Sequence, residues 1–166
     1  MQMSKTTPLM LGIGGDSGTG KSTLVGGIYR IFGAEKITNI NLDDYHTFDR
    51  AQRKIYGLTA LDPAANNMAL MGKHAGQLKN GEKIIKPVYD HSTGTFADPE
   101  EVEPRSIVII GGLFPFFTQE LRDVFDLKVY LDPDEELKRN WKIQRDAGKR
   151  GYTIEQVRKE IEARQE

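Results

Sequence analysis

The feature that most constrains this chain is a glycine-rich loop placed between an apolar segment and an amphipathic one. Residues 15–22 read GDSGTGKS and match the pattern G-x-x-x-x-G-K-[ST]. The apolar run at residues 9–13 predicts a buried strand, and the apolar periodicity of residues 21–32 predicts a helix. Glycines let such a loop curl so that successive N–H groups point at one anion, and the helix N-terminus adds its positive dipole end. This context favours a phosphate-binding loop over a chance glycine-rich turn.

The rest of the chain alternates predicted strands and helices. Further strands are predicted over residues 36–42, 106–110 and 127–131, and further helices over residues 66–78 and 116–124 and after Thr153. Another helix is expected to start at Pro133, with Asp132 as its cap and Trp141 packed in the core. Residues 83–98 indicate a small hairpin. The sequence therefore predicts an α/β fold of P-loop NTPase type, a parallel sheet with helices on both faces and a small β-hairpin excursion.

Length and composition bound the class of protein. The 166 residues predict one domain, over residues 1–166. The chain has 23 Lys and Arg against 24 Asp and Glu, so its net charge of −1 lacks the positive excess that would indicate binding to nucleic acid or a membrane surface. The chain has no Cys, which excludes a disulfide framework, a Cys-ligated zinc site and an iron–sulfur cluster. No apolar run approaches the length of a membrane span, so we expect a soluble, cytoplasmic protein.

The loop supplies the candidate ATP-binding residues. Lys21 can reach the β- and γ-phosphates, and the Ser22 hydroxyl can bind Mg²⁺. The predicted ATP-binding set is Gly15, Asp16, Ser17, Gly18, Thr19, Gly20, Lys21, Ser22 and Thr23. Such loops serve kinases, motors, switches and transporters, so the loop alone leaves the acceptor open.

A second polar cluster follows the strand predicted over residues 36–42. Asp43 and Asp44 come directly after it, with His46 and Arg50 close behind. Ligands of open α/β sheets bind at the carboxyl ends of the strands, the edge that also carries the phosphate loop. A carboxylate there can accept a hydroxyl proton or bind Mg²⁺, and an arginine can hold a phosphate. The alternative is a simple turn or helix cap, and position alone does not separate the two.

At this point the chain resembles the phosphoribulokinase/uridine kinase family. The matching segments cover most of the chain in the family's order: GDSGTGKST (residues 15–23), LDDYHTFDR (42–50), GLTALDPAANN (57–67), LKNGEKIIKPVYDHSTG (78–94) and DLKVYLDPDEELKRNWKIQRDAGKRGYT (126–153). The phosphate loop is generic, whereas TALDPAANN and WKIQRD…KRGYT favour the phosphoribulokinases over the uridine kinases.

The resemblance implies a reaction and a set of roles. The γ-phosphoryl group of ATP would move to the 1-hydroxyl of ribulose 5-phosphate, giving ribulose 1,5-bisphosphate. Asp43 resembles the general base and, with Ser22, a metal ligand. The implied catalytic residues are Asp43, Lys21, Arg145 and Arg150, and the implied substrate contacts are His46, Arg50, Tyr89, His91 and Lys142. Tyr89 could instead serve only in packing. The implied partners are ATP with Mg²⁺ and a sugar phosphate, and the assembly state stays open, a homodimer included.

A basic stretch supports the last of these roles independently. Residues 138–150 hold six Lys or Arg and one acid in a chain that is neutral overall. Such a stretch can neutralise charge on transferring phosphoryl oxygens. Charge runs are more often solvated helix faces, and the acids at residues 134–136 could pair with part of this one. The resemblance favours catalysis for Arg145 and Arg150.

One position departs from the family. Gly111 stands where the family usually carries a glutamate, in the segment Gly111–Pro115, and Phe114 replaces the usual histidine. In P-loop enzymes an acid here helps to hold Mg²⁺. We rank three interpretations: an active enzyme in which Asp43, Asp44 or water substitutes, an altered inactive variant, and a nucleotide-binding regulatory module without turnover. A uridine-kinase-like enzyme for another small metabolite is the alternative within the same class.

Two further differences concern regulation and length. Light-regulated members carry cysteines at the positions of Thr19 and Asn41, so the resemblance does not imply thiol control here. Longer members also continue with further sheet and helix after the segment that ends this chain. We therefore expect a single P-loop domain that lacks the C-terminal part of those longer members.

Overall fold

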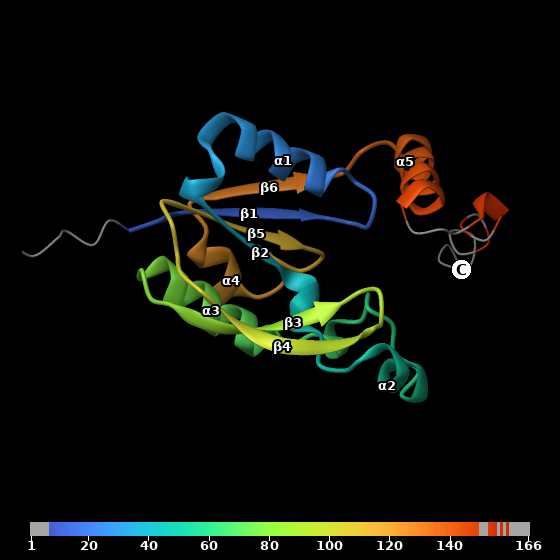
Figure 1. The fold of residues 1–166 in the computed structure, drawn as a ribbon, viewed down its shortest axis with the longest axis horizontal. Coiled ribbons are helices and arrows are strands. Elements are labelled where there is room, and N and C mark those ends of the chain that lie inside the picture. Colours follow the sequence, from blue (N-terminus) through green and yellow to red (C-terminus); the bar gives the residue numbers. More distant parts are fainter. Residues whose placement is uncertain (1–6, 150–152, 156, 158, 160–166) are drawn as a thin grey trace, which may run out of the picture.

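The computed structural model describes residues 7–149, 153–155, 157 and 159. At its centre lies a four-stranded parallel sheet in the order β2-β5-β1-β6 (Figure 1). The strands are β1 (Leu9–Gly15), β2 (Ile37–Asn41), β5 (Ile107–Gly112) and β6 (Leu127–Leu131). Helices lie on both faces of this sheet, which confirms the predicted α/β fold.

The strand order brings the functional loops to one edge of the sheet. Strand β5 lies between β1 and β2, with Gly111 paired to Ile13 on one side and to Asn41 on the other. Because all strands run parallel, the chain leaves β1 into the phosphate loop and β2 into the Asp43 turn at the same edge. The sheet thus positions both predicted halves of the site together.

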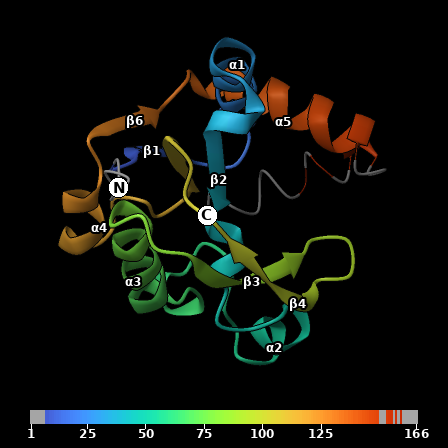
Figure 2. The same cartoon turned by 60° about the vertical axis from the view of Figure 1, so that its left-hand side comes forward.

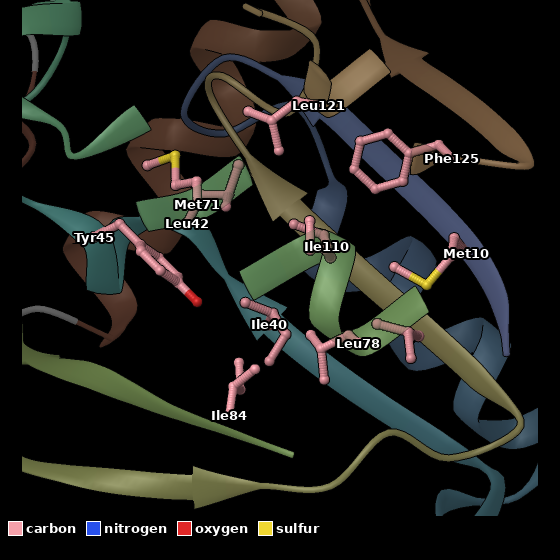
Figure 3. Close-up of a cluster of buried hydrophobic side chains, with 12 residues drawn as sticks. Met10, Ile40, Leu42, Tyr45, Met71, Leu78, Ile84, Ile110, Leu121 and Phe125 are labelled. Carbon is pink, nitrogen blue, oxygen red and sulfur yellow. The ribbon is translucent and has the colours of Figure 1, made fainter. Parts of the chain in front are cut away.

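Each face of the sheet packs its own apolar cluster. Helix α1 (Lys21–Phe32) covers one face, and helices α3 (Met68–Lys79) and α4 (Gln119–Val124) cover the other (Figure 2). The α1 side buries Leu11, Ile13, Ile37 and Ile109. The larger cluster on the α3 and α4 side includes Met10, Ile40, Met71, Leu78, Ile110, Leu121 and Phe125 (Figure 3). Helices packed on both faces explain why the central strands are apolar almost throughout.

The predicted hairpin is present and stands apart from the main sheet. Strands β3 (Ile84–Asp90) and β4 (Thr95–Val102) form a separate two-stranded antiparallel sheet (Figure 1). Short helical elements complete the chain on this side and at the ends of the strands: η1 (Ala34–Lys36), η2 (Leu42–Tyr45), α2 (Arg50–Ile55) and η3 (Pro63–Ala65). In the part of the chain that the structure describes, no helix has the length and apolar character to cross a membrane.

Three helix starts and one core assignment differ from the prediction. Helix α3 begins at Met68 rather than Asn66, because the Asn67 side chain accepts the Leu70 N–H at 3.1 Å and caps it. Helix α4 begins at Gln119 rather than Phe116, because the Thr118 hydroxyl accepts the Leu121 N–H at 3.2 Å and caps it. Helix α5 (Glu135–Lys149) begins after Asp134, whose carboxylate accepts the Glu136 N–H at 2.9 Å, so Asp132 and Pro133 lie before the helix. Trp141 is not a core residue, since 40% of it is exposed.

Candidate active site

The phosphate loop has the backbone shape that the motif predicts. Gly18 and Gly20 adopt positive φ angles of 88° and 91°, the left-handed region that side chains disfavour. The buried Thr19 hydroxyl donates to the Asp16 carbonyl at 2.9 Å and closes the turn. Gly20 then serves as the N-cap of α1 without a side-chain cap, so no cap side chain stands in front of the helix N-terminus, the part of a helix that binds anions.

The loop lysine points back into this turn. The Lys21 ammonium donates to the carbonyl oxygens of Gly15 and Asp16 at 2.6 and 2.7 Å. These bonds hold the charge at the mouth of the loop, where a bound phosphate would compete for it. Ser22 and Thr23 follow on the exposed first turn of α1. The loop therefore presents a cation, backbone donors and a hydroxyl in one place.

Helix α5 lies across the loop. A methyl group at Gly18 would stand 3.3 Å from the Cβ of Lys142, and one at Gly20 would stand 3.6 Å from the Trp141 ring. The Lys138 ammonium lies 3.6 Å from the Asp16 carboxylate and 2.6 Å from that of Glu135. Hydrogen bonding to Glu135 is the main cause that raises the pKa of Lys138, with Asp16 adding to it. The basic helix thus covers the nucleotide side of the site.

The structure describes only part of the two predicted catalytic arginines. Arg145 belongs to helix α5, but its side chain, like the whole of Arg150, falls outside the described residues. Lys142 is buried beside Gly18, so this predicted substrate residue lies against the phosphate loop. The expectation that acids upstream pair with the basic run is confirmed at Glu135 and Lys138.

Asp43 sits on the turn that follows β2. The Asn41 side chain accepts the Asp43 N–H at 3.1 Å and starts the short helix η2. The Asp43 carboxylate lies 3.5 Å from Nε2 of His91, at the end of the hairpin strand β3. Two predicted site residues that are far apart in sequence therefore meet here.

Asp44 has a different role from its neighbour. One of its oxygens accepts from the Lys86 ammonium at 2.7 Å and the other from the Tyr89 N–H at 3.0 Å. Lys86 also lies 2.8 Å from the Glu100 carboxylate. Burial lowers the pKa of Lys86, but the two carboxylates outweigh it and the pKa is raised overall. Asp44 therefore joins the hairpin to η2. Of the groups that could replace the missing acid at Gly111 in holding Mg²⁺, Asp43 and water remain.

An aromatic cluster lies next to the Asp43–His91 pair. The Tyr89 ring makes edge contacts with the rings of His46 and His91, with centroids 4.8 and 5.1 Å apart. Tyr89 is buried and its hydroxyl accepts from Arg53 at 2.7 Å, so packing between the two histidines is the role that the structure describes. Burial, followed by the charge of Arg53, lowers the pKa of His46 and keeps it neutral.

Arg50 and Arg53 both lie on helix α2 and both contact the β3–β4 hairpin. The Arg50 guanidinium donates to the His91 carbonyl at 2.6 Å and lies against Gly94 in the hairpin turn. Arg53 as a whole residue is 8% exposed, and its guanidinium donates to the Phe48 carbonyl and to the Tyr89 hydroxyl. Within the described residues no carboxylate pairs with Arg53. The guanidinium also lies over the Tyr89 ring, 5.2 Å from its centroid, which stabilises part of its charge. A buried cation without an anion is still costly, so this spot suits a negatively charged ligand.

Arg53 was not among the residues predicted from the sequence. The signal that could have found it is the pair Asp49 and Gln52, which form a capping box and start helix α2, so that Arg50 and Arg53 lie three residues apart on one face.

The oxygen donors at this edge of the sheet are suited to Mg²⁺ bound with a nucleotide. In the described part of the chain, no three His, Asp or Glu side chains gather into a metal cage. Mg²⁺ in phosphoryl-transfer sites takes one or two protein oxygens and completes its shell with phosphates and water. The Ser22 hydroxyl and the Asp43 carboxylate are donors of this kind. At Gly111 a Cβ would lie 3.7 Å from the Ile13 carbonyl, so the backbone leaves ordinary space for a side chain.

Comparison with known proteins gives a consistent pattern. The model of the Phosphoribulokinase / Uridine kinase family matches residues 10–166. Phosphoribulokinase from Synechocystis sp. is 49% identical over 94% of this chain and 47% of its own length. Uridine kinase from Clostridium perfringens is 36% identical over 90% of this chain and 74% of its own length. The chain thus spans about half the length of the phosphoribulokinase relative.

A solved structure agrees on the fold. Phosphoribulokinase from Rhodobacter spheroides superposes with a TM-score of 0.65 over 90% of this chain and 59% of that one. The sequences are 22% identical, so this likeness speaks for the architecture.

Proposed function

The chain belongs to the phosphoribulokinase / uridine kinase family, and on that basis we propose that it is an ATP-dependent kinase acting on ribulose 5-phosphate. The γ-phosphoryl group of ATP moves to the 1-hydroxyl and gives ribulose 1,5-bisphosphate and ADP. The identity of 49% to a phosphoribulokinase, against 36% to a uridine kinase, supports this substrate over a nucleoside.

The main support for the proposal is the Arg53 guanidinium, which is buried and has no carboxylate partner in the described part of the chain. Arg50 lies on the same helix and donates to the His91 carbonyl, and the His91 ring lies 3.5 Å from the Asp43 carboxylate; we call Arg50 and Arg53 the arginine wall. Arginine forks match phosphate oxygens, and a phosphate supplies the charge that burial of Arg53 requires. Ribulose 5-phosphate carries such a group, whereas uridine does not.

The transfer step uses groups from three parts of the fold. Asp43 accepts the proton of the attacking 1-hydroxyl, whose oxygen forms a bond to the γ-phosphorus. The bond from that phosphorus to the bridging oxygen breaks and the electron pair leaves with ADP. Lys21 and the loop N–H groups stabilise charge on the phosphoryl oxygens, and Arg145 and Arg150 on the basic segment add to this.

Mg²⁺ would be held by Ser22 and Asp43 together with phosphate oxygens, and when bound it supplies charge neutralisation on the phosphates. His46, His91 and Lys142 complete the proposed substrate contacts, and Tyr89, which the sequence also offered as a contact, packs between the two histidines. We place this reaction in the cytoplasm, in a single domain over residues 1–166, and leave open whether two copies assemble.

A paired-substrate assay tests the reaction. ADP release is measured with Mg²⁺ and ATP, using ribulose 5-phosphate and uridine side by side. We expect turnover with ribulose 5-phosphate only. Activity with uridine alone would overturn the substrate assignment, and an Asp43→Asn variant with full turnover would overturn the base assignment.

A variant of Arg53 tests whether its guanidinium binds the phosphate of the substrate. Arg53→Leu should raise KM for ribulose 5-phosphate by about 10- to 100-fold, the size of one charge-assisted contact, and leave KM for ATP unchanged. Lys54→Gln, the exposed neighbour on the same helix, is the matched control and should keep both constants. Equal KM values for Arg53→Leu and the unmodified chain would remove the argument for a phosphate at this wall.

Gly111 favours one alternative from another class, a nucleotide-binding module without turnover. It predicts ATP binding without sugar phosphorylation, and activity gained in Gly111→Glu, for which the backbone has space. Efficient turnover of the unmodified chain would dispose of this alternative.

A further inference from the structure

The segment at residues 57–67 is hydrogen-bonded to the turn that follows Asp43, the proposed general base. His46 and Asn66 face each other as an isolated antiparallel bridge. Backbone hydrogen bonds of 2.8 Å flank this bridge, from Thr47 to the segment and from Asn67 back to the turn. The proposed reaction gives this segment no role, yet it contacts a site histidine directly.

The hydrogen bonds of Asn66 fix which way its amide points. The Asn66 Nδ2 atom lies 2.8 Å from the Asp62 carbonyl oxygen and 3.3 Å from that of Ala60. Carbonyl oxygens only accept, so the NH₂ group must face them and the amide oxygen must face the other way. That oxygen lies 3.0 Å from Nδ1 of His46.

The amide orientation in turn fixes the proton on His46. Because the Asn66 oxygen can only accept, Nδ1 of His46 must carry the hydrogen and donate it. Burial and the nearby Arg53 charge lower the pKa of His46, so the ring is neutral near pH 7 and has a single proton. Nε2 is then left with a lone pair and acts as an acceptor.

The acceptor nitrogen reaches solvent. In the described residues Nε2 of His46 has no hydrogen-bond partner, and no buried side-chain nitrogen or oxygen is left unsatisfied. Nε2 therefore reaches solvent-accessible space although the residue as a whole is buried. Asp43, Arg53 and His91 are the charged or titratable groups that influence it.

We propose that Asn66 is a positioning residue that sets His46 as a hydrogen-bond acceptor, so that His46 holds a hydroxyl group of the substrate and not its phosphate. A phosphate near pH 7 offers mainly acceptor oxygens, which a lone pair repels and which the arginine wall matches. A sugar hydroxyl supplies the donor that Nε2 needs. The substrate part of this inference rests on the proposed function, whereas the proton position does not.

Nitrogen NMR on the unmodified full chain, labelled with ¹⁵N-histidine and free of substrate, tests the proton position. The chain has three histidines, so the spectrum is simple to assign. We expect His46 to show a protonated Nδ1 and an unprotonated Nε2 near pH 7.5. A proton on Nε2, or an imidazolium, would overturn the inference without any reference to activity.

Two neighbouring asparagines supply a matched pair of variants. Asn66→Ala should release the fixed tautomer, and the His46 signals should move toward exchange between both forms. Asn67→Ala removes the cap of α3, where its oxygen accepts the Leu70 N–H at 3.1 Å, and should leave the His46 signals in place. Unchanged His46 signals in Asn66→Ala would contradict a positioning role.

Kinetics of two His46 variants test the hydroxyl contact. His46→Gln can place an amide oxygen near the former Nε2, whereas His46→Asn keeps only the bond toward Asn66. We expect KM for ribulose 5-phosphate to be about five- to tenfold higher in His46→Asn than in His46→Gln, the value of one neutral hydrogen bond. Equal KM values overturn the hydroxyl contact. An inactive unmodified chain would overturn the proposed function instead, and the NMR result would still decide the proton position.

Discussion

The Lys86 ammonium lies 2.7 Å from the Asp44 carboxylate, with both side chains largely shielded from solvent. This ion pair joins the β3–β4 hairpin to the turn next to Asp43, and the Tyr89 N–H reinforces it on the other carboxylate oxygen. The hairpin and the turn therefore cannot shift relative to each other without exposing a buried charge. Their junction sets the distance between Asp43 and His91.

Removal of Lys86 should destabilise the protein strongly. Lys86→Met leaves Asp44 without its cation, and breaking a buried pair on one side costs about 3 to 5 kcal/mol. Lys83→Met is the matched control, since Lys83 pairs with Glu101 and Glu103 at an exposed position where such pairs contribute at most about 1 kcal/mol. Urea unfolding of both variants measures the difference. Equal losses would show that the Lys86 pair is no more important than a surface pair.

Two adjacent glycines at the end of β5 should respond differently to alanine. A Cβ at Gly112 would lie 2.6 Å from the Cβ of Leu42, whereas at Gly111 the nearest atom within 4 Å is the Ile13 carbonyl oxygen at 3.7 Å. We expect Gly112→Ala to lower the free energy of unfolding by about 1 to 3 kcal/mol through overpacking. Gly111→Ala should stay within about 0.5 kcal/mol of the unmodified chain. Urea unfolding tests both, and a destabilised Gly111→Ala would mean that a glutamate could not be introduced there either.

Elements with local signals could be predicted from the sequence. Helix α1 occupies Lys21–Phe32 as expected, because the loop glycines precede it and Gly33 follows it. The start of α5 was two residues off because aspartates flank Pro133 on both sides. Either aspartate could cap the helix by local sequence rules. Asp134 is distinguished from Asp132 only by the packing of the helix, in which Lys138 reaches the phosphate loop.

Contacts between distant segments could not be predicted in the same way. Asp43 and Asp44 look equivalent in sequence, yet only the arrival of Lys86 from the hairpin separates their roles. The exposure of Trp141 likewise depends on α5 lying on the loop rather than on the sheet. Arg53 and Asn66 gain their meaning from tertiary neighbours, Tyr89 and His46, that no periodicity indicates.

The position of Trp141 makes it a reporter of nucleotide binding. It is the single tryptophan of the chain and its ring lies beside Gly20 of the phosphate loop. A nucleotide that orders or displaces α5 must change the surroundings of this half-exposed ring, so ATP with Mg²⁺ should change its emission in a saturable way. Adenosine, which has no phosphates for the loop, is the control and should give no saturable change in the same range. If calorimetry showed ATP binding but the Trp141 emission did not change, α5 would not respond to occupation of the phosphate loop.

The buried His74 should make stability fall in mild acid. Its Nδ1 lies 3.0 Å from the Tyr45 hydroxyl, and burial, with Lys73 adding to it, lowers the pKa of His74 below its ordinary value of 6.5. Below that value the unfolded chain binds a proton that the folded chain does not. The free energy of unfolding should therefore fall as the pH drops from 6.5 toward the folded pKa, by at most about 1.4 kcal/mol per pH unit for this group.

Urea unfolding at about pH 7.5 and about pH 5.5 measures this loss in the unmodified chain and in a His74→Gln variant. His74→Gln keeps a partner for the Tyr45 hydroxyl but cannot titrate, so it should lose less stability between the two pH values than the unmodified chain does. The part that remains should include His46, whose pKa burial also lowers. If His74→Gln and the unmodified chain lost the same free energy, the buried His74 would not be a source of the acid sensitivity.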